Sequence, residues 1–215
     1  LLFIKALDIF GDIPYQSDFI ALLIKYADWL MEDNNYIDNN NHGIFEDLAL
    51  LHISVLLDSH PKAVLWKKQA VKRLNRLFEV AYYDDFTNNE NSIRYFEINN
   101  NLYGQVIQFC ENYSISGIDK LKERLEKSTE TLITFSHKDC SFPLIGDGRI
   151  FYGKESNQDS RLFPDIGIGI LKIKETYMSF KCKTVFQAHA HIDVSSITAR
   201  YKNIDFIIDS GQYNY

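Results

Sequence analysis

The stretch Pro143-Leu144-Ile145-Gly146-Asp147-Gly148 lies where the sequence pattern changes, and that change decides the predicted fold. Before it, apolar residues recur at the three- and four-residue spacing of helices that bury one face. After it, glycine and proline separate short apolar runs, as in chains that form sheets. We therefore predict an α+β chain, with a helical domain in residues 1–133 and the start of an antiparallel sheet domain in residues 134–215.

The helical half contains amphipathic segments that are predicted as helices. They lie at residues 19–30, 44–55, 63–81, 103–109 and 118–132. Asparagine-rich patches at residues 33–41 and 88–101 lie between such segments and are interpreted as polar loops.

The second half shows the periodicity of strands. In residues 178–183, apolar and polar side chains alternate, which predicts a strand with one solvent-exposed polar face. Residues 204–208 form a further short apolar run with β-branched members. Both runs fit an antiparallel sheet.

Composition limits the classes of function. The 215 residues are 46% hydrophobic, which is enough for a substantial core, and the net charge of -6 gives no global case for binding nucleic acid. No apolar run reaches the roughly 20 residues that cross a bilayer.

Cys110, Cys140 and Cys182 are too widely spaced for a paired zinc motif and are interpreted as free thiols. Both ends look cut, since the chain starts at Leu1 and stops at Tyr215, so the lack of a signal peptide does not indicate a compartment.

The densest group of chemically active residues is His189-Ala190-His191-Ile192-Asp193. In an extended strand, alternate side chains share a face, so both histidines and Asp193 are predicted to point the same way. A second strand that ends at Asp209 would bring another carboxylate beside them. Two imidazoles and carboxylates can bind a metal or transfer protons, or they can be hydrogen-bonded partners inside a polar sheet.

Two further segments are predicted at the mouths of helices. Asn41 and His42 open a helix, where unpaired backbone N–H groups favour an anion, so they could hold a substrate carboxylate. One asparagine there could equally be only a helix cap, with His42 a surface residue. Tyr103 is predicted at the mouth of the next helix, but with 13 tyrosines in the chain nothing in the pattern alone singles it out.

Taken together, these segments resemble the heparinase II/III-like polysaccharide lyases, which include heparin/heparan lyases and oligoalginate lyases. Asn41-His42-Gly43 is similar to the family's Asn-His-Gly segment, and Tyr103 follows at a similar distance. Pro143-Leu144-Ile145-Gly146-Asp147 resembles a Pro-x-x-Gly-Asp segment that enters the sheet domain. His189–Asp193 and Asp209-Ser210-Gly211-Gln212-Tyr213 resemble the family's His-Gly-His-Ala-Asp and Asp-x-Gly-x-Tyr pair.

The resemblance implies an incomplete (α/α) toroid followed by an incomplete antiparallel β-sandwich. It also implies cleavage of uronic-acid polysaccharides by β-elimination. Asn41 with His42 would neutralise the uronate carboxylate. Tyr103 would be the acid, and also the base for one substrate epimer, while His189 is the other candidate base.

A structural zinc ion is implied as well. By the resemblance, His191 and Asp209 would be ligands and a third histidine ligand would lie beyond Tyr215. We interpret Asp193 separately, as a residue that contacts the ligands and not the metal. The partner would be an acidic polysaccharide, with a carboxylate-only polymer favoured by the acidic balance, and the location periplasmic or secreted in a bacterium. The alternatives are a non-catalytic carbohydrate-binding protein of the same fold and a metal-dependent hydrolase built on His189, His191 and Asp209.

Overall fold

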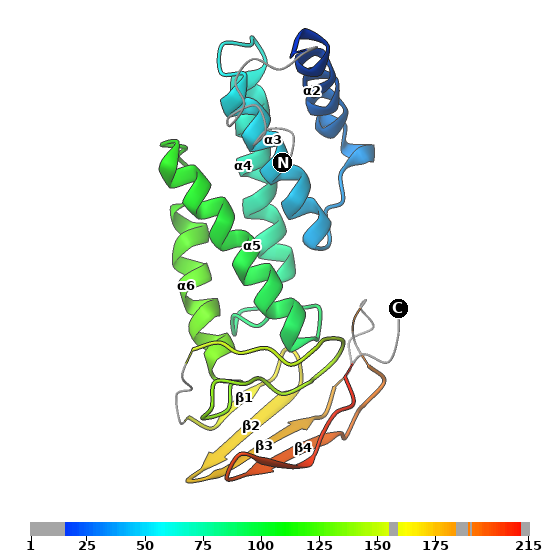
Figure 1. The fold of residues 1–215 in the computed structure, drawn as a ribbon, viewed down its shortest axis with the longest axis vertical. Coiled ribbons are helices and arrows are strands. Elements are labelled where there is room, and N and C mark those ends of the chain that lie inside the picture. Colours follow the sequence, from blue (N-terminus) through cyan, green and yellow to red (C-terminus); the bar gives the residue numbers. More distant parts are fainter. Residues whose placement is uncertain (1–15, 155–158, 184–188, 190, 212–215) are drawn as a thin grey trace. The chain divides into compact units, whose positions relative to one another are not determined.

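The structure is a computed structural model that describes residues 16–154, 159–183, 189 and 191–211. Within these ranges helices come first and an antiparallel sheet follows (Figure 1), which confirms the predicted α+β class. The helices are α2 (Gln16–Met31), the short 3-10 helix η1 (Asp33–Asn35), α3 (Asn41–Leu56), α4 (Ala63–Ala81), α5 (Ile93–Asn112) and α6 (Asp119–Ile133). The strands are β1 (Arg161–Phe163), β2 (Ile168–Ile173), β3 (Thr176–Lys181), β4 (Ile197–Tyr201) and β5 (Ile204–Ile207). None of the helices described could cross a membrane.

The chain divides into two compact units. The first comprises Leu1–Val80 with Gln105–Asp119, and the second comprises Ala81–Gly104 with Lys120–Tyr215. Helix α5 contributes its first part to the second unit and its last part to the first. Each unit is therefore described by itself.

The first unit is built around α4. Trp66, Leu74 and Leu77 of this helix are almost completely buried, as the helical spacing predicts. The guanidinium of Arg73 is buried too, and it donates a hydrogen bond of 2.6 Å from Nη1 to the carbonyl oxygen of Leu30 at the end of α2. The buried guanidinium is thus hydrogen-bonded to a carbonyl oxygen in the last turn of α2, where carbonyl groups lack a partner within the helix.

The second unit holds a five-stranded meander. Each strand pairs antiparallel with the next along the chain, in the order β1-β2-β3-β4-β5. Its core joins the sheet to the helices through aromatic rings: Phe135 stacks on Phe163 of β1 with centroids 4.6 Å apart and meets the edge of Phe96 in α5 at 6.4 Å. These contacts fix the sheet relative to the start of α5.

The asparagine-rich patch at residues 88–101 was predicted as a loop, and this is wrong for its second half. Helix α5 begins at Ile93 and runs through the asparagines. Asn100 accepts a hydrogen bond of 2.8 Å from the Tyr82 hydroxyl, and Asn99 donates one of 3.0 Å to Glu90. Buried partners of this kind offset the low helix propensity of asparagine.

Strand β3 is confirmed, but its faces are the reverse of the prediction. Ser179 and Lys181 are buried, whereas Phe180 is 45% exposed. Ser179 shares a hydrogen bond of 2.6 Å with Thr198, and the Lys181 ammonium lies 2.6 Å from Asp193. Polar side chains that contact one another therefore line the inner face of this strand.

Candidate functional site

One carboxylate joins the two histidines of the motif. Asp147 Oδ2 lies 3.3 Å from His189 Nδ1, and Asp147 Oδ1 lies 3.1 Å from His191 Nε2. The segment is not the strand predicted from the sequence: His189 lies in a turn with φ of +75°, and residues 191–195 contain no strand. The histidines converge because they approach Asp147 from an irregular segment, and not because they share a strand face.

The turn that carries Asp147 is held on two sides. The Ile93 N–H donates to the Ile145 carbonyl at 3.1 Å, and the Asp147 N–H donates to the His189 carbonyl at 3.0 Å. Gly146 lies between these bonds with φ of +73°, and a Cβ on it would lie 2.6 Å from the carbonyl oxygen of Asn91. Only glycine fits this conformation and this space. Gly146 therefore allows the tight turn that holds Asp147 beside the histidines.

The remaining faces of His189 meet Tyr95 in the first turn of α5 and Glu90 in the turn before this helix. The ring of Tyr95 stacks on the imidazole, with centroids 3.5 Å apart and planes 10° from parallel. Glu90 Oε2 lies 3.6 Å from His189 Nε2, and this glutamate is only 5% exposed. A phenol, an imidazole and a buried carboxylate in contact are a set of groups that can exchange protons.

Tyr103 does not lie at the mouth of a helix, as was predicted. It lies in the middle of α5, its side chain is 0% exposed, and its ring centroid is 6.0 Å from that of Tyr82. The tyrosine in the first turn of α5 is Tyr95, whose N–H donates to Ser92 Oγ at 3.2 Å. The sequence signal that was missed is Ser92, a helix-capping residue that marks where α5 begins.

The metal-binding prediction falls on residues that the structure brings together. His191, Asp193 and Asp209 each offer one ligand atom, and these atoms all lie within 4.8 Å of one another. His191 Nδ1 is 3.4 Å from Asp209 Oδ1. Neither Asp193 oxygen has a hydrogen-bond partner, and the nearby Lys181 ammonium lacks hydrogen-bond geometry. Imidazole and carboxylate groups are ligand types that a divalent metal such as zinc takes, and here Asp193 Oδ1 also pairs with the Lys181 ammonium at 2.6 Å.

Asn41 and His42 belong to the first unit. Asn41 is the first residue of α3, and the helix cap is its neighbour Asn40, whose Oδ1 accepts a hydrogen bond of 2.9 Å from the His42 N–H. The side chain of Asn41 is therefore not used as the cap, and His42 is exposed. A Cβ on Gly43 would lie 2.1 Å from the Ile37 carbonyl oxygen, which explains the glycine after His42.

A family comparison identifies the chain. The model of the heparinase II/III N-terminus matches residues 3–166, which is more than half of the sequence. The chain belongs to the heparinase II/III N-terminus family. A comparison with curated protein sequences found no match.

Solved structures of heparinases share the fold of this family member. The heparinase III gene product BT4657 has a TM-score of 0.77 at 19% identity, covering 92% of this chain and 36% of that one. Heparan sulfate lyase HepC from Pedobacter heparinus has a TM-score of 0.74 at 19% identity, with 92% and 36% covered. Another heparinase III structure has a TM-score of 0.82 at 17% identity, with 97% and 41% covered. The chain thus spans less than half the length of these relatives.

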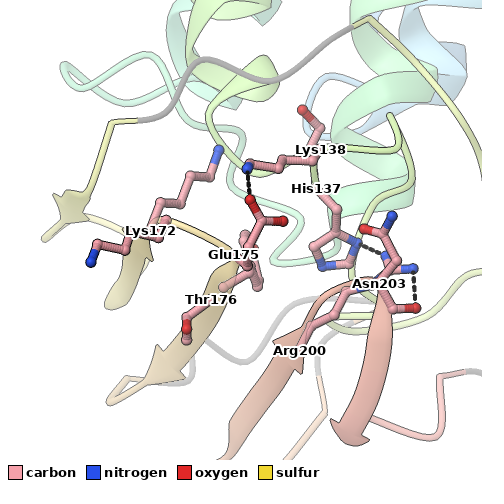
Figure 2. Close-up of a pocket in the computed structure, with 10 residues that line it drawn as sticks. His137, Lys138, Lys172, Glu175, Thr176, Arg200 and Asn203 are labelled. Carbon is pink, nitrogen blue, oxygen red and sulfur yellow. Dashed lines mark hydrogen bonds and ion pairs between the residues drawn. The ribbon is translucent and has the colours of Figure 1, made fainter.

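A second polar cluster of this heparinase II/III chain has a different character. Arg200 donates to His137 Nδ1 at 2.6 Å and to Asp139 Oδ2 at 2.8 Å (Figure 2 shows the contact with His137). Burial, reinforced by the Arg200 charge, lowers the pKa of His137 to about 4. Ser141 Oγ also contacts His137, but Asp139 contacts Ser141 and Arg200. In a catalytic triad the histidine lies between the serine and the carboxylate, so Ser141, His137 and Asp139 do not form one.

Proposed function

We propose that the full-length protein is a polysaccharide lyase that cleaves a uronate-containing acidic polysaccharide by β-elimination. The observation that carries the proposal is the stack of Tyr95 on His189 beside the buried carboxylate of Glu90. Membership of the heparinase II/III family supports the same reaction class. Because the relatives are much longer than this chain, the activity belongs to the whole protein.

The chemistry requires three tasks. The proton next to a uronate carboxylate is only weakly acidic, so the negative charge that develops during its removal must be stabilised. The resemblance to the family's Asn-His-Gly segment is the basis on which we assign this role to Asn41 and His42, and neither side chain serves as the cap of α3. His189 accepts the proton, and an acid then donates a proton to the oxygen of the broken glycosidic bond.

We assign the acid role to Tyr95 and not to Tyr103. A proton donor must touch the substrate, and the side chain of Tyr103 is fully buried, whereas Tyr95 is part-exposed and lies against His189. The two tyrosines are eight residues apart on the same helix, α5. They therefore form a matched pair for mutagenesis.

A zinc ion held by His191, Asp209 and Asp193 is the second part of the proposal. The ion would supply a structural link between the 191–195 segment and the end of the sheet. His191→Ala is expected to lower zinc content and thermal stability together.

The charge of the chain supports our proposal for the substrate class. An acidic chain with a net charge of -6 suits a polymer with carboxylates alone better than a heavily sulfated one. A polysaccharide of this kind is found outside the cytoplasm. We therefore propose that the protein is periplasmic or secreted.

The test compares Tyr95→Phe with Tyr103→Phe in the full-length protein. Tyr95→Phe is expected to lower kcat by about 10²- to 10⁴-fold, because a general acid contributes on that order. Tyr103→Phe is expected to keep near-normal turnover and to lose about 1 kcal/mol of stability at most from its buried hydroxyl. Release of the unsaturated uronate product and thermal melting measure the two effects. If Tyr103→Phe lost turnover and Tyr95→Phe kept it, the assignment would be reversed.

A further inference from the structure

A pocket of the first unit lies between α4 and the segment that precedes α3. Its volume is about 350 Å³, which falls in the range of sites that bind small molecules. Lys72, Arg73 and Arg76 of α4 line it, and they outnumber its two carboxylates, Asp33 and Asp38. The pocket is therefore locally basic in a chain whose net charge is -6.

The buried side chain of Arg73 fixes the shape of this pocket. Its Nη1 and Nη2 donate hydrogen bonds of 2.6 and 3.2 Å to the carbonyl oxygens of Leu30 and Met31, and Nη2 also donates to Asp33 at 3.0 Å. Its guanidinium lies 4.2 Å from the ring centroid of Tyr36. These contacts join α4 to the segment after α2, so the pocket is formed before a ligand enters it.

Lys72 and Arg76 are the cations that a ligand can reach. Both are exposed, and Lys72 forms no ion pair with any residue that the structure describes. Arg76 Nη2 lies 3.4 Å from Asp38 Oδ2, and because both side chains are more than half exposed this ion pair is weak. The Arg76 guanidinium has five N–H donors, so a second carboxylate can share it.

The buried carboxyl group of Asp47 in α3 does not cancel these positive charges. Asp47 is 1% exposed, and burial raises its pKa to about 8, while the charge of Glu46 acts in the same direction and Tyr36 and Arg73 oppose the rise. Near pH 7 this carboxyl group is therefore mostly uncharged. The charged groups that remain at the pocket favour an anion.

The pocket also adjoins the first turn of α3, which carries Asn41 and His42. A Cβ placed on Gly43 would lie 3.1 Å from the hydroxyl oxygen of Tyr36 and 3.0 Å from Cδ2 of Leu77, and both of these residues line the pocket. A polymer whose carboxylate is held by the first turn of α3 can therefore place another of its units in the pocket.

We propose that the pocket binds a further uronate unit of the polysaccharide, with Lys72 and Arg76 contacting its carboxylate. The amide of Gln69, which also lines the pocket, can donate to and accept from sugar hydroxyl groups. The inference rests on the proposed function for the identity of the polymer. It implies that the protein recognises carboxylates on more than one sugar of the chain.

The experiment uses the full-length protein with Tyr95→Phe, so that oligosaccharides bind without being cleaved. Hexasaccharides of alginate, hyaluronan and unsulfated heparosan are titrated by calorimetry, each beside its carboxyl-reduced, uncharged counterpart. At low salt, at least one acidic hexasaccharide is expected to bind more tightly than its reduced form. Lys72→Gln combined with Arg76→Gln should raise the Kd of that hexasaccharide by about tenfold and leave the Kd of the reduced form unchanged, and high salt should remove the difference.

Lys67→Gln combined with Lys68→Gln is the matched control. It removes the same charge from the same helix, at residues that do not line the pocket, so the Kd of the acidic hexasaccharide should stay the same. With Tyr95 intact, the pocket variant should raise KM by about tenfold and leave kcat unchanged, because the lost contact is made equally in the ground state and the transition state. Both variants replace side chains that support no core contact, so their melting temperatures should match that of the wild type.

Equal Kd values for the acidic hexasaccharide in the pocket variant and the control variant would overturn the inference, as would the absence of binding across the panel. Pocket-dependent binding in a protein that releases no unsaturated product would uphold the inference while the proposed function failed. Release of unsaturated product with a normal KM in the pocket variant would uphold the proposed function and overturn the inference.

Discussion

His137 shows how one buried side chain makes stability depend on pH. Its Nδ1 accepts from Arg200, its ring meets the edge of Tyr177 at 4.3 Å, and the charges of Asp139 and Lys172 act on it in opposite directions. Burial and Arg200 lower its pKa from 6.5 to about 4, so the folded protein keeps it neutral. The contribution of neutral His137 to the free energy of unfolding is fully present above pH 6.5. It is lost as the pH falls toward 4, because the histidine binds a proton at a higher pH in the unfolded chain than in the folded protein.

We predict that the midpoint temperature of thermal unfolding decreases as the pH is lowered from 6.5 to 4. The loss of folding free energy that comes from His137 is on the order of 3 kcal/mol. His137→Gln, which cannot be protonated, should remove this part of the slope while lowering stability at neutral pH. Melting curves of both proteins across the range measure it. Equal slopes for wild type and variant would show that other groups cause the acid sensitivity.

At the scale of the element, the turn at Gly146 connects the start of α5 with the histidine segment. Gly146→Ala would place a Cβ 2.6 Å from the carbonyl oxygen of Asn91 and 2.9 Å from that of His189. An alanine with positive φ costs about 1–2 kcal/mol even without a clash. We predict a lower melting temperature and a lower kcat, because Asp147 moves with the turn.

Gly104→Ala is the control for that prediction. Gly104 lies inside α5, and no atom lies within 4 Å of a Cβ placed on it. Alanine there should stabilise the helix by up to about 1 kcal/mol and leave turnover unchanged. If the two variants had similar melting temperatures and activities, the turn would not be the constraint that the contacts indicate.

The elements also show what the sequence can predict. Helical spacing located α2, α3, α4 and α6, since each buries one apolar stripe. It missed the first ten residues of α5, where the asparagines are stabilised by tertiary hydrogen bonds that no local pattern contains. The faces of β3 were reversed for a related reason: Lys181 is buried because Asp193, distant in sequence, lies beside it.

The sequence motifs led to some of the residues that the structure brings together, but not to all of them. The motif contains His189 and His191, but their convergence depends on Asp147, about forty residues earlier in the Pro-x-x-Gly-Asp segment. Tyr103 was placed at the mouth of a helix because the Ser92 cap was not used, and its burial in the middle of α5 is the reason that our proposal assigns the acid role to Tyr95. Contacts between distant segments are what a single sequence does not display.

At the scale of the whole molecule, one face of the sheet is apolar and open in the described residues. Its exposed side chains include Leu162, Leu171, Ile173 and Phe180. Exposed apolar surface of this kind usually packs against another layer. The β-sandwich of the resemblance stays a prediction that this face supports.

The most direct test of the account is the product that the full-length protein makes from uronate polysaccharides. A panel of heparan sulfate, alginate, hyaluronan and bacterial capsular glycans would be followed by the ultraviolet absorbance of unsaturated uronate ends. We predict that one carboxylate-rich polymer yields these ends and that His189→Ala abolishes them while the protein still melts cooperatively. New reducing ends without the unsaturated chromophore, or binding without cleavage across the panel, would contradict β-elimination at this site.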